Sequence, residues 1–177
     1  IWLYSTFEMI KESYEVILIN DNSPDNSWKL IKEIKETNNN IIGINLSRNF
    51  GQHAAIFAGL EKASGDWIII MDCDLQDVPE EIDTLYKKAL QGYDIVLGKR
   101  VVRKDSLLKR SFSKLFYKIL SYLTETWQDP QIANFGIYKK NAINAVLAMG
   151  DYMKYFPTMI KWIGFKSTSI DIKHGAR

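Results

Sequence analysis

An α/β fold with a mainly parallel sheet and helices on both faces is the architecture that this sequence predicts. Apolar runs short enough for strands alternate along the chain with longer segments whose apolar residues recur at helical spacing. The runs are continuous rather than alternating with polar residues, which is typical of strands buried on both faces. Short polar connectors separate them, without a repeat, a low-complexity segment or a linker. We therefore expect residues 1–177 to form one domain.

The first half of the chain follows this alternation closely. Apolar runs predict strands at Tyr14–Asn20, Ile41–Ser47, Trp67–Met71 and Ile95–Gly98. The helices expected between them are Asp25–Thr37, Gly51–Ala63 and Pro79–Gln91. The last of these has a proline in its first turn and Gly92 just past its end, the usual positions of both residues. Repeated β-α-β units imply neighbouring parallel strands covered by the connecting helices.

The pattern loosens after Gly98. A basic segment leads into an amphipathic helix that we expect from Ser106 to Leu123. A short strand at Asn134–Tyr138, a helix ending at Met149 and an alternating strand at Ser167–Ile172 complete the predicted elements.

Composition excludes several classes of protein. A hydrophobic fraction of 46% and a charged fraction of 25% are those of an ordered globular domain. The net charge of +2 is too small to indicate a nucleic-acid partner. The single cysteine rules out an internal disulfide, and no apolar run is long enough to span a bilayer. The chain begins with Ile1 inside an apparent helix, so we interpret it as a fragment truncated at both ends.

Two carboxylates follow the strand at Trp67–Met71 directly. In open α/β sheets, ligands bind beyond the carboxyl ends of the strands, which is where Asp72 and Asp74 are expected. Together with the amide oxygen of Gln76, they suit a hard divalent cation such as Mg²⁺ or Mn²⁺ that shares its oxygen ligands with substrate phosphates. The alternative is a surface turn, in which aspartate is common. Cys73, placed between the two carboxylates, is expected to be a poor thiolate.

The strand at Tyr14–Asn20 also ends in acidic residues. Two parallel strands that carry carboxylates to one edge of a sheet would form an acidic crevice, which accepts an anion only if a cation intervenes. This arrangement indicates a phosphate ligand bridged by a metal. Asp25 is favoured as the cap of the helix that follows. Asp21 has no such local task, so we expect it to hydrogen-bond a base or a ribose.

Four segments carry a resemblance to a known family. Asn20-Asp21-Asn22-Ser23-Pro24-Asp25-Asn26-Ser27 resembles the Val-Asp-Asp-Gly-Ser-x-Asp-x-Ser motif of family 2 glycosyltransferases, and Ser47-Arg48-Asn49-Phe50-Gly51 resembles the segment after the next strand. Asp72-Cys73-Asp74-Leu75-Gln76-Asp77-Val78-Pro79-Glu80 is similar to the Asp-x-Asp-Leu-Gln-x-Pro-Pro-Glu signature of the polyisoprenyl-phosphate branch, which contains dolichol-phosphate mannose synthase. His174-Gly175-Ala176-Arg177 resembles the start of that branch's His-x-x-Arg motif.

The resemblance implies a GT-A fold, which is Rossmann-like, in a catalytic domain lacking its first strand upstream of Ile1. It also implies a nucleotide-diphosphate sugar donor and a metal ion held by Asp72, Asp74 and Gln76. The donor contacts that it implies are Asp21, Asn49, Gln52, Asp72, Arg100 and Arg110, with Arg177 as a further phosphate contact. Guanidinium groups suit phosphate oxygens, although a solvated basic face is the alternative for these arginines.

Asn134 departs from the family pattern. Many inverting members have Asp before Phe where this chain reads Asn134-Phe135. Asparagine cannot take a proton from a sugar hydroxyl, whereas a lipid phosphate is already ionised and can attack unaided. Asn134 therefore favours a polyisoprenyl phosphate acceptor, with Asn134 orienting the reacting groups beside Asp74. Asp129 is the alternative source of a base, and loss of activity is the third possibility.

The resemblance and these residues together predict an inverting glycosyltransferase at the cytoplasmic face of a membrane. The amphipathic helix 106–123, with basic residues off its apolar stripe, suits a membrane surface, but such helices more often cover a core. A saccharide hydroxyl acceptor is the second hypothesis, and a catalytically silent module that binds a nucleotide sugar is the third.

Overall fold

The computed structural model describes residues 12–74, 76–100, 132–150 and 154–173, together with Thr6, Ile10 and Gly175. Its strands are β1 (Val16–Asn20), β2 (Ile41–Asn45), β3 (Trp67–Ile70), β4 (Ile95–Arg100), β5 (Ile132–Lys139) and β6 (Ser167–Ile172). Its helices are α2 (Ser27–Thr37), α3 (Gln52–Lys62), α4 (Glu81–Ala89), α6 (Lys140–Ala148) and α7 (Phe156–Trp162). The predicted α/β class is confirmed.

The strands form two sheets within the described residues. β1 and β2 pair in parallel, from Val16 opposite Ile41 to Asn20 opposite Asn45. The larger sheet has the order β3-β5-β4-β6, in which β4 and β6 are parallel while β5 runs antiparallel to both of its neighbours. The pairing is therefore less uniformly parallel than the β-α-β pattern predicts. The reason is that β5 enters the sheet between two strands that precede it in the chain.

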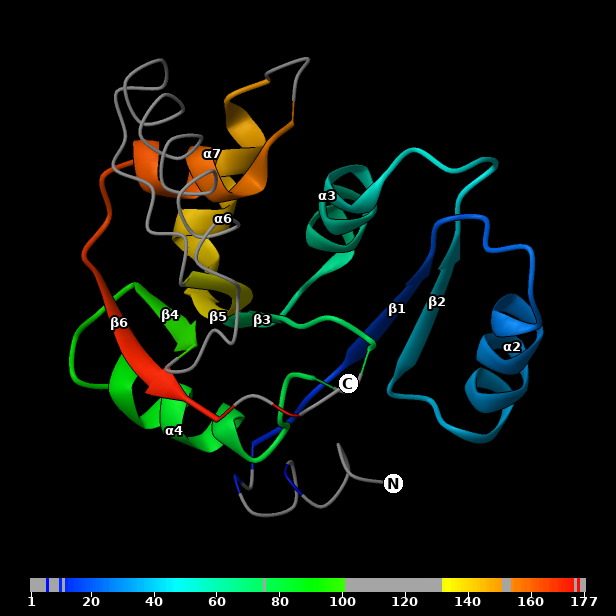
Figure 1. The fold of residues 1–177 in the computed structure, drawn as a ribbon, viewed down its shortest axis with the longest axis horizontal. Helices are drawn as coiled ribbons and strands as arrows, with labels where there is room; N and C mark the ends of the chain where they lie inside the picture. Colours follow the sequence, from blue (N-terminus) through cyan, green and yellow to red (C-terminus); the bar gives the residue numbers. More distant parts are fainter. Residues whose placement is uncertain are drawn as a thin grey trace, which may run out of the picture.

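Helices cover both faces of the larger sheet (Figure 1). On one face, α3, α6 and α7 pack against β3, β4 and β5 through a cluster that includes Phe57, Ile95, Leu97, Ile143 and Phe156. On the other face, α4 packs against β4, β5 and β6 through Ile82, Leu85, Val96, Phe135 and Ile137. Successive residues of β4 thus enter opposite cores, as the period of a strand requires. This burial on both faces explains why the strand reads as a continuous apolar run.

α2 packs on the smaller sheet beside β2 (Figure 1). A Cβ at Gly43 of β2 would lie 2.8 Å from Cγ2 of Ile31 and 3.3 Å from a ring carbon of Trp28. Trp28 and Ile31 therefore contact the smaller sheet, whereas Ile34, which helical spacing predicts on the same face of α2, is 43% exposed. The N-cap position of the helix is Asn26 rather than the predicted Asp25, but Asp25 Oδ1 accepts the N–H of Ser27, the first residue of α2, at 2.9 Å.

Three side chains of α3, spaced one helical turn apart, contact three consecutive residues at the start of α7. Two of these residues precede the helix and the third is its first residue. The His53 ring meets Tyr155 edge-on with ring centroids 4.7 Å apart, and Phe57 meets Phe156 in the same way at 6.3 Å. Lys154 Nζ lies 3.7 Å from Glu61 Oε1. Burial lowers the pKa of His53, so its imidazole is neutral at pH 7. These contacts hold α3 against the larger sheet's helical layer.

Most predicted elements are present with shifts of one or two residues at their ends. α7 was not predicted from the sequence, because it is short and its first turn contains Pro157. The predicted helix 106–123 lies outside the described residues.

Candidate functional site

Polar side chains meet where β1 and β2 end. Asn20 and Asn45 are the last pair of the parallel ladder, and Asn20 Nδ2 donates a 2.6 Å hydrogen bond to Asn45 Oδ1. An aspartate at position 20, as in the family motif, could not donate that bond. Asn22 has a φ of 54°, a left-handed conformation that favours glycine and tolerates asparagine. The chain therefore turns sharply after Asp21 and leaves its carboxylate at the carboxyl ends of the strands.

Asp21 binds the loop that joins β2 to α3. Its Oδ1 accepts the N–H of Phe50 and its Oδ2 accepts the N–H of Gly51, both at 2.8 Å. Asp21 thus has a long-range structural task that the sequence did not indicate, because it anchors the start of α3. Each carboxylate oxygen can accept a second hydrogen bond, so a ligand contact is compatible with this anchoring role.

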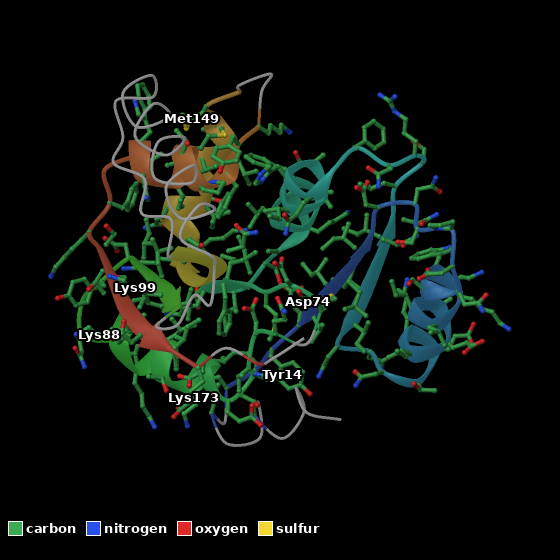
Figure 2. All side chains as sticks on the ribbon, in the orientation of Figure 1. Tyr14, Asp74, Lys88, Lys99, Met149 and Lys173 are labelled. Carbon is green, nitrogen blue, oxygen red and sulfur yellow. The ribbon has the colours of Figure 1, made fainter. Side chains whose placement is uncertain are left out.

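Gln52, the first residue of α3, connects this loop to the end of β3. Its Nε2 donates a 2.8 Å hydrogen bond to Asp72 Oδ1. Asp21 therefore holds Phe50 and Gly51, and the next residue along the chain holds Asp72. These contacts link Asp21 to Asp72 through the loop before α3, which is compatible with the predicted shared site. Asp74, which follows Asp72 by two residues, lies near the centre of the view in Figure 2.

The loop after β3 is closed by its own hydrogen bonds. The N–H of Asp72 donates to Asp77 Oδ2 and the N–H of Gln76 donates to Asp74 Oδ1, both at 3.1 Å. The carbonyl oxygen of Gln76 accepts the N–H of Gly175 at 2.8 Å, so Gly175 lies against this loop. Asp77 is only 2% exposed, whereas Asp74 is exposed. The loop thus presents the carboxylate of Asp74 outward and buries that of Asp77.

The pairing of β3 with β5 bears on the position of Asn134. The last pair of this ladder is Ile70 opposite Gly136. Asn134 of β5 lies two residues beyond that pair, and Asp72 lies two residues beyond it in the loop after β3, so both residues are near this end of the ladder. Arg100 ends β4 opposite Ile172 of β6, so its backbone is at the edge of the same sheet.

The loop has a strongly negative local potential. The pKa of the Cys73 thiol is raised by desolvation of the sulfur and further by the charges of Asp72 and Asp74, which confirms that it is a poor thiolate. The oxygen atoms of two carboxylates are the donor set that a hard divalent cation prefers, with substrate phosphates and water as its other ligands. No group of three or more His, Cys, Asp or Glu residues able to hold a metal occurs in the described part of the chain.

Most of the chain matches a known family. The model of the family "Glycosyl transferase family 2" matches residues 2–149. The chain belongs to glycosyl transferase family 2. This match contains β1 to β5 and α6, and therefore Asp21, Gln52, Asp72, Asp74 and Asn134.

Curated members of the family are similar over most of this chain. An undecaprenyl-phosphate 4-deoxy-4-formamido-L-arabinose transferase of Photorhabdus laumondii is 36% identical over 171 residues, which cover 96% of this chain and 53% of that protein. The protein of the same name from Shewanella sediminis is 38% identical over 165 residues, covering 93% of this chain and 50% of its own length. The chain thus spans about half the length of these relatives.

Solved structures support the GT-A-like fold. The bifunctional IspDF of Campylobacter jejuni superimposes with a TM-score of 0.57 at 15% identity, covering 97% of this chain and 42% of that one. TarS 1–349 of S. aureus superimposes with a TM-score of 0.54 at 16% identity, covering 98% of this chain and 55% of that one. At such identities the likeness concerns the fold alone.

The structure brings together most of the residues that the family resemblance singles out. Asp21, Gln52, Asp72, Asp74 and Gln76 adjoin one another through the contacts above, and Asn49 is exposed on the loop before Phe50. Arg110, Asp129 and Arg177 lie outside the described residues. Within the described ranges, no helix has both the length and the apolar composition needed to cross a membrane.

Asp77 is a site residue that sequence reasoning did not assign. Asp77 belongs to the Asp72–Glu80 motif, but an acidic residue in a loop is expected to be exposed, and its burial could not be predicted from the sequence. The signal that could have identified it is its distance of five residues from Asp72, which allows a side chain to close the loop on the backbone.

Proposed function

We propose that this chain is the catalytic domain of an inverting glycosyltransferase that moves a sugar from a nucleotide-diphosphate sugar to a polyisoprenyl phosphate. The observation that carries the proposal is the continuous set of contacts from Asp21 through Phe50 and Gly51 to Gln52 and Asp72. These contacts connect the carboxyl ends of β1 and β3 through the loop after β2, and the carboxyl ends of the strands are where an α/β sheet binds its ligand.

The roles proposed for the donor side follow from this geometry. Asp21, through its remaining acceptor capacity, would hold the nucleoside, with Asn49 on the same loop. Asp72 and Asp74, with Gln76, would hold Mg²⁺ or Mn²⁺, and Arg100 and Arg110 would bind phosphates. A divalent cation bound there would stabilise the charge of the departing diphosphate. Gln52 donates a hydrogen bond to one oxygen of the Asp72 carboxylate and so fixes its orientation. The other carboxylate oxygen would then bind the cation.

The acceptor is proposed from Asn134 and from the names of the relatives. Asn134 lies two residues beyond the last pair of the β3–β5 ladder, at the end from which the loop with Asp72 follows β3. It has no basic group, so the nucleophile must arrive ionised, as a phosphate does at neutral pH. The curated relatives are named undecaprenyl-phosphate transferases, which supports a lipid phosphate. We place the reaction at the cytoplasmic face of a membrane, because the acceptor would reside there.

One prediction of this proposal concerns the substrates of the protein. In the full-length protein, a nucleoside diphosphate is expected to raise the melting temperature only when Mg²⁺ or Mn²⁺ is present, because ligand binding stabilises the native state. A panel of UDP, GDP, CDP, ADP and dTDP would identify the base. With the corresponding sugar donor, transfer to undecaprenyl phosphate is expected, and transfer to a free oligosaccharide is not.

The outcomes separate the alternatives. Transfer to the oligosaccharide alone would favour a saccharide acceptor and a base such as Asp129. Metal-dependent nucleotide binding without transfer to either acceptor would indicate a catalytically silent binding module. Absence of nucleotide binding would contradict the proposed function itself.

A further prediction concerns Asp77, which we expect to position the proposed metal ligands. Asp77→Ala removes the side chain that accepts the N–H of Asp72, so the loop loses its closure. We expect the affinity for Mn²⁺ to fall about 10- to 100-fold, the usual cost of losing an outer-shell partner. Asp77→Asn retains an oxygen acceptor and is expected to bind Mn²⁺ nearly as the parent does.

Mn²⁺ titration monitored by electron paramagnetic resonance measures this affinity directly. Chemical denaturation of both variants separates it from any loss of stability caused by the buried substitution. If the Ala and Asn variants bind Mn²⁺ equally well, the closure of the loop by Asp77 does not position the ligands.

A further inference from the structure

Phe50 is an exposed aromatic residue next to the proposed donor site. The residue is 48% exposed, although it lies between β2 and α3, which are both ordered by packing. The loop residues before it are Leu46, Ser47, Arg48 and Asn49, of which the last three are polar and exposed. The ring therefore does not extend an apolar patch of the kind that docks another protein or a lipid surface.

The position of the Phe50 ring is set by Asp21. The N–H of Phe50 donates to Asp21 Oδ1 at 2.8 Å, which fixes the Phe50 backbone beside that carboxylate. With ordinary bond lengths, the ring centroid cannot be more than about 8 Å from the carboxylate oxygen. The next residue, Gly51, has a φ of +91°, and apart from its two chain neighbours nothing in the described structure lies within 4 Å of the place where its Cβ would be. The space on that side of Gly51, at the start of α3, is therefore open.

Arg48 occupies one face of the ring. Its guanidinium carbon lies 4.5 Å from the ring centroid, in the geometry of a cation–π contact. A ring that is half exposed while one face is covered by a guanidinium must present its other face and edge to solvent. A planar aromatic face of this kind suits a second planar π-system, and the adjacent guanidinium adds positive charge that favours an anionic ligand.

We propose that Phe50 is the stacking platform for the nucleobase of the donor, with Arg48 supporting the ring from behind. The inference rests on the proposed function, because it assigns the ligand to the nucleoside diphosphate class. Stacking on an aromatic face is tolerant of base identity, since every base has a π-face. Phe50 thus contributes affinity for the nucleoside, while the choice of base depends on hydrogen bonds such as those that Asp21 can accept.

The test compares a ligand that has a base with one that lacks it. The probes are the nucleoside diphosphate that binds the parent protein most tightly in a panel of UDP, GDP, CDP, ADP and dTDP, and inorganic pyrophosphate, each with Mn²⁺. Phe50→Ala in the full-length protein keeps the backbone N–H that binds Asp21. We expect it to weaken nucleoside diphosphate binding about 10- to 100-fold, the measured range for loss of one stacked base, and pyrophosphate binding less than twofold. Phe50→Trp is expected to restore binding.

Leu30→Ala provides the matched control, because Leu30 is an apolar side chain of α2 that is 54% exposed and outside the site. It should leave both affinities unchanged. Phe50→Ala binding both probes like the parent would overturn the inference alone, as would an equal loss of both probes, since the ring would then act through the loop. Failure of the parent protein to bind any nucleoside diphosphate would overturn the proposed function and this inference with it.

Discussion

Replacing Asp74 with Ala in the full-length protein is expected to lower sugar transfer by about three orders of magnitude. Asp74 is the exposed carboxylate of the loop after β3, and its Oδ1 already accepts the N–H of Gln76. The remaining acceptor capacity is available to the proposed cation, which would stabilise the leaving diphosphate by several kcal/mol. Because each 1.4 kcal/mol corresponds to about a tenfold change in rate, loss of the ligand has a large effect. Initial rates at saturating donor measure it.

Asp83→Ala is a suitable control for this variant. Asp83 is an acidic residue of α4 whose Oδ2 pairs with Lys87 one turn later, and such exposed pairs contribute little to stability. The control should retain parental activity, and the Asp74 variant should need a higher Mn²⁺ concentration for any residual activity. Full activity of Asp74→Ala at low Mn²⁺ would contradict the metal-binding role.

Asp21→Ala is expected to weaken nucleoside diphosphate binding at least tenfold and to loosen the start of α3. Two backbone N–H groups, of Phe50 and Gly51, lose their acceptors together. The same substitution removes the proposed nucleoside contact and releases the loop that leads to Gln52, the partner of Asp72. Asn at this position would restore only one acceptor oxygen and direct an amide N–H₂ toward a second donor, so Asp21→Asn should be impaired as well. Isothermal titration with Mn²⁺ present measures the affinity.

Asp25→Ala separates this effect from a general loss of structure. Asp25 lies in the same polar segment, but its carboxylate accepts the N–H of Ser27 at the start of α2, and hydrogen bonds from the side chain and the backbone of Ser27 lower its pKa. Its removal should destabilise α2 and leave nucleotide affinity unchanged. If the two variants bind nucleotide equally, Asp21 has no special role in the donor pocket.

The strands were predictable because their signal is local. The strands Val16–Asn20 and Trp67–Ile70 carry apolar side chains on both of their faces, which is typical of strands covered on both sides. Their bounds were predicted to within two residues. The order of the strands was not predictable, because a continuous apolar run can lie in a parallel or an antiparallel ladder. β5 illustrates this point: its insertion between β3 and β4 depends on contacts between residues far apart in the chain.

α7 and Asp77 show the same limit for a helix and for a site residue. α7 has seven residues, and its stability comes from burying Phe156, Met159 and Ile160 against neighbouring elements rather than from its own propensity. Asp77 differs from Asp74 in sequence only by its position in a loop. Its burial, and its hydrogen bond to the backbone of Asp72, separate the two roles.

The sequence by itself determined the α/β class, the family resemblance and the carboxyl-end position of the acidic residues, since each is written in the spacing of nearby side chains. Only the tertiary structure decided what each acid does. Asp21 anchors a loop that lies about thirty residues further along the chain, Asp77 closes its own loop, and Asp74 is left exposed. A hydrogen bond requires its two atoms to lie within about 3 Å, and for residues so distant in sequence that distance is set by the packing of the whole domain.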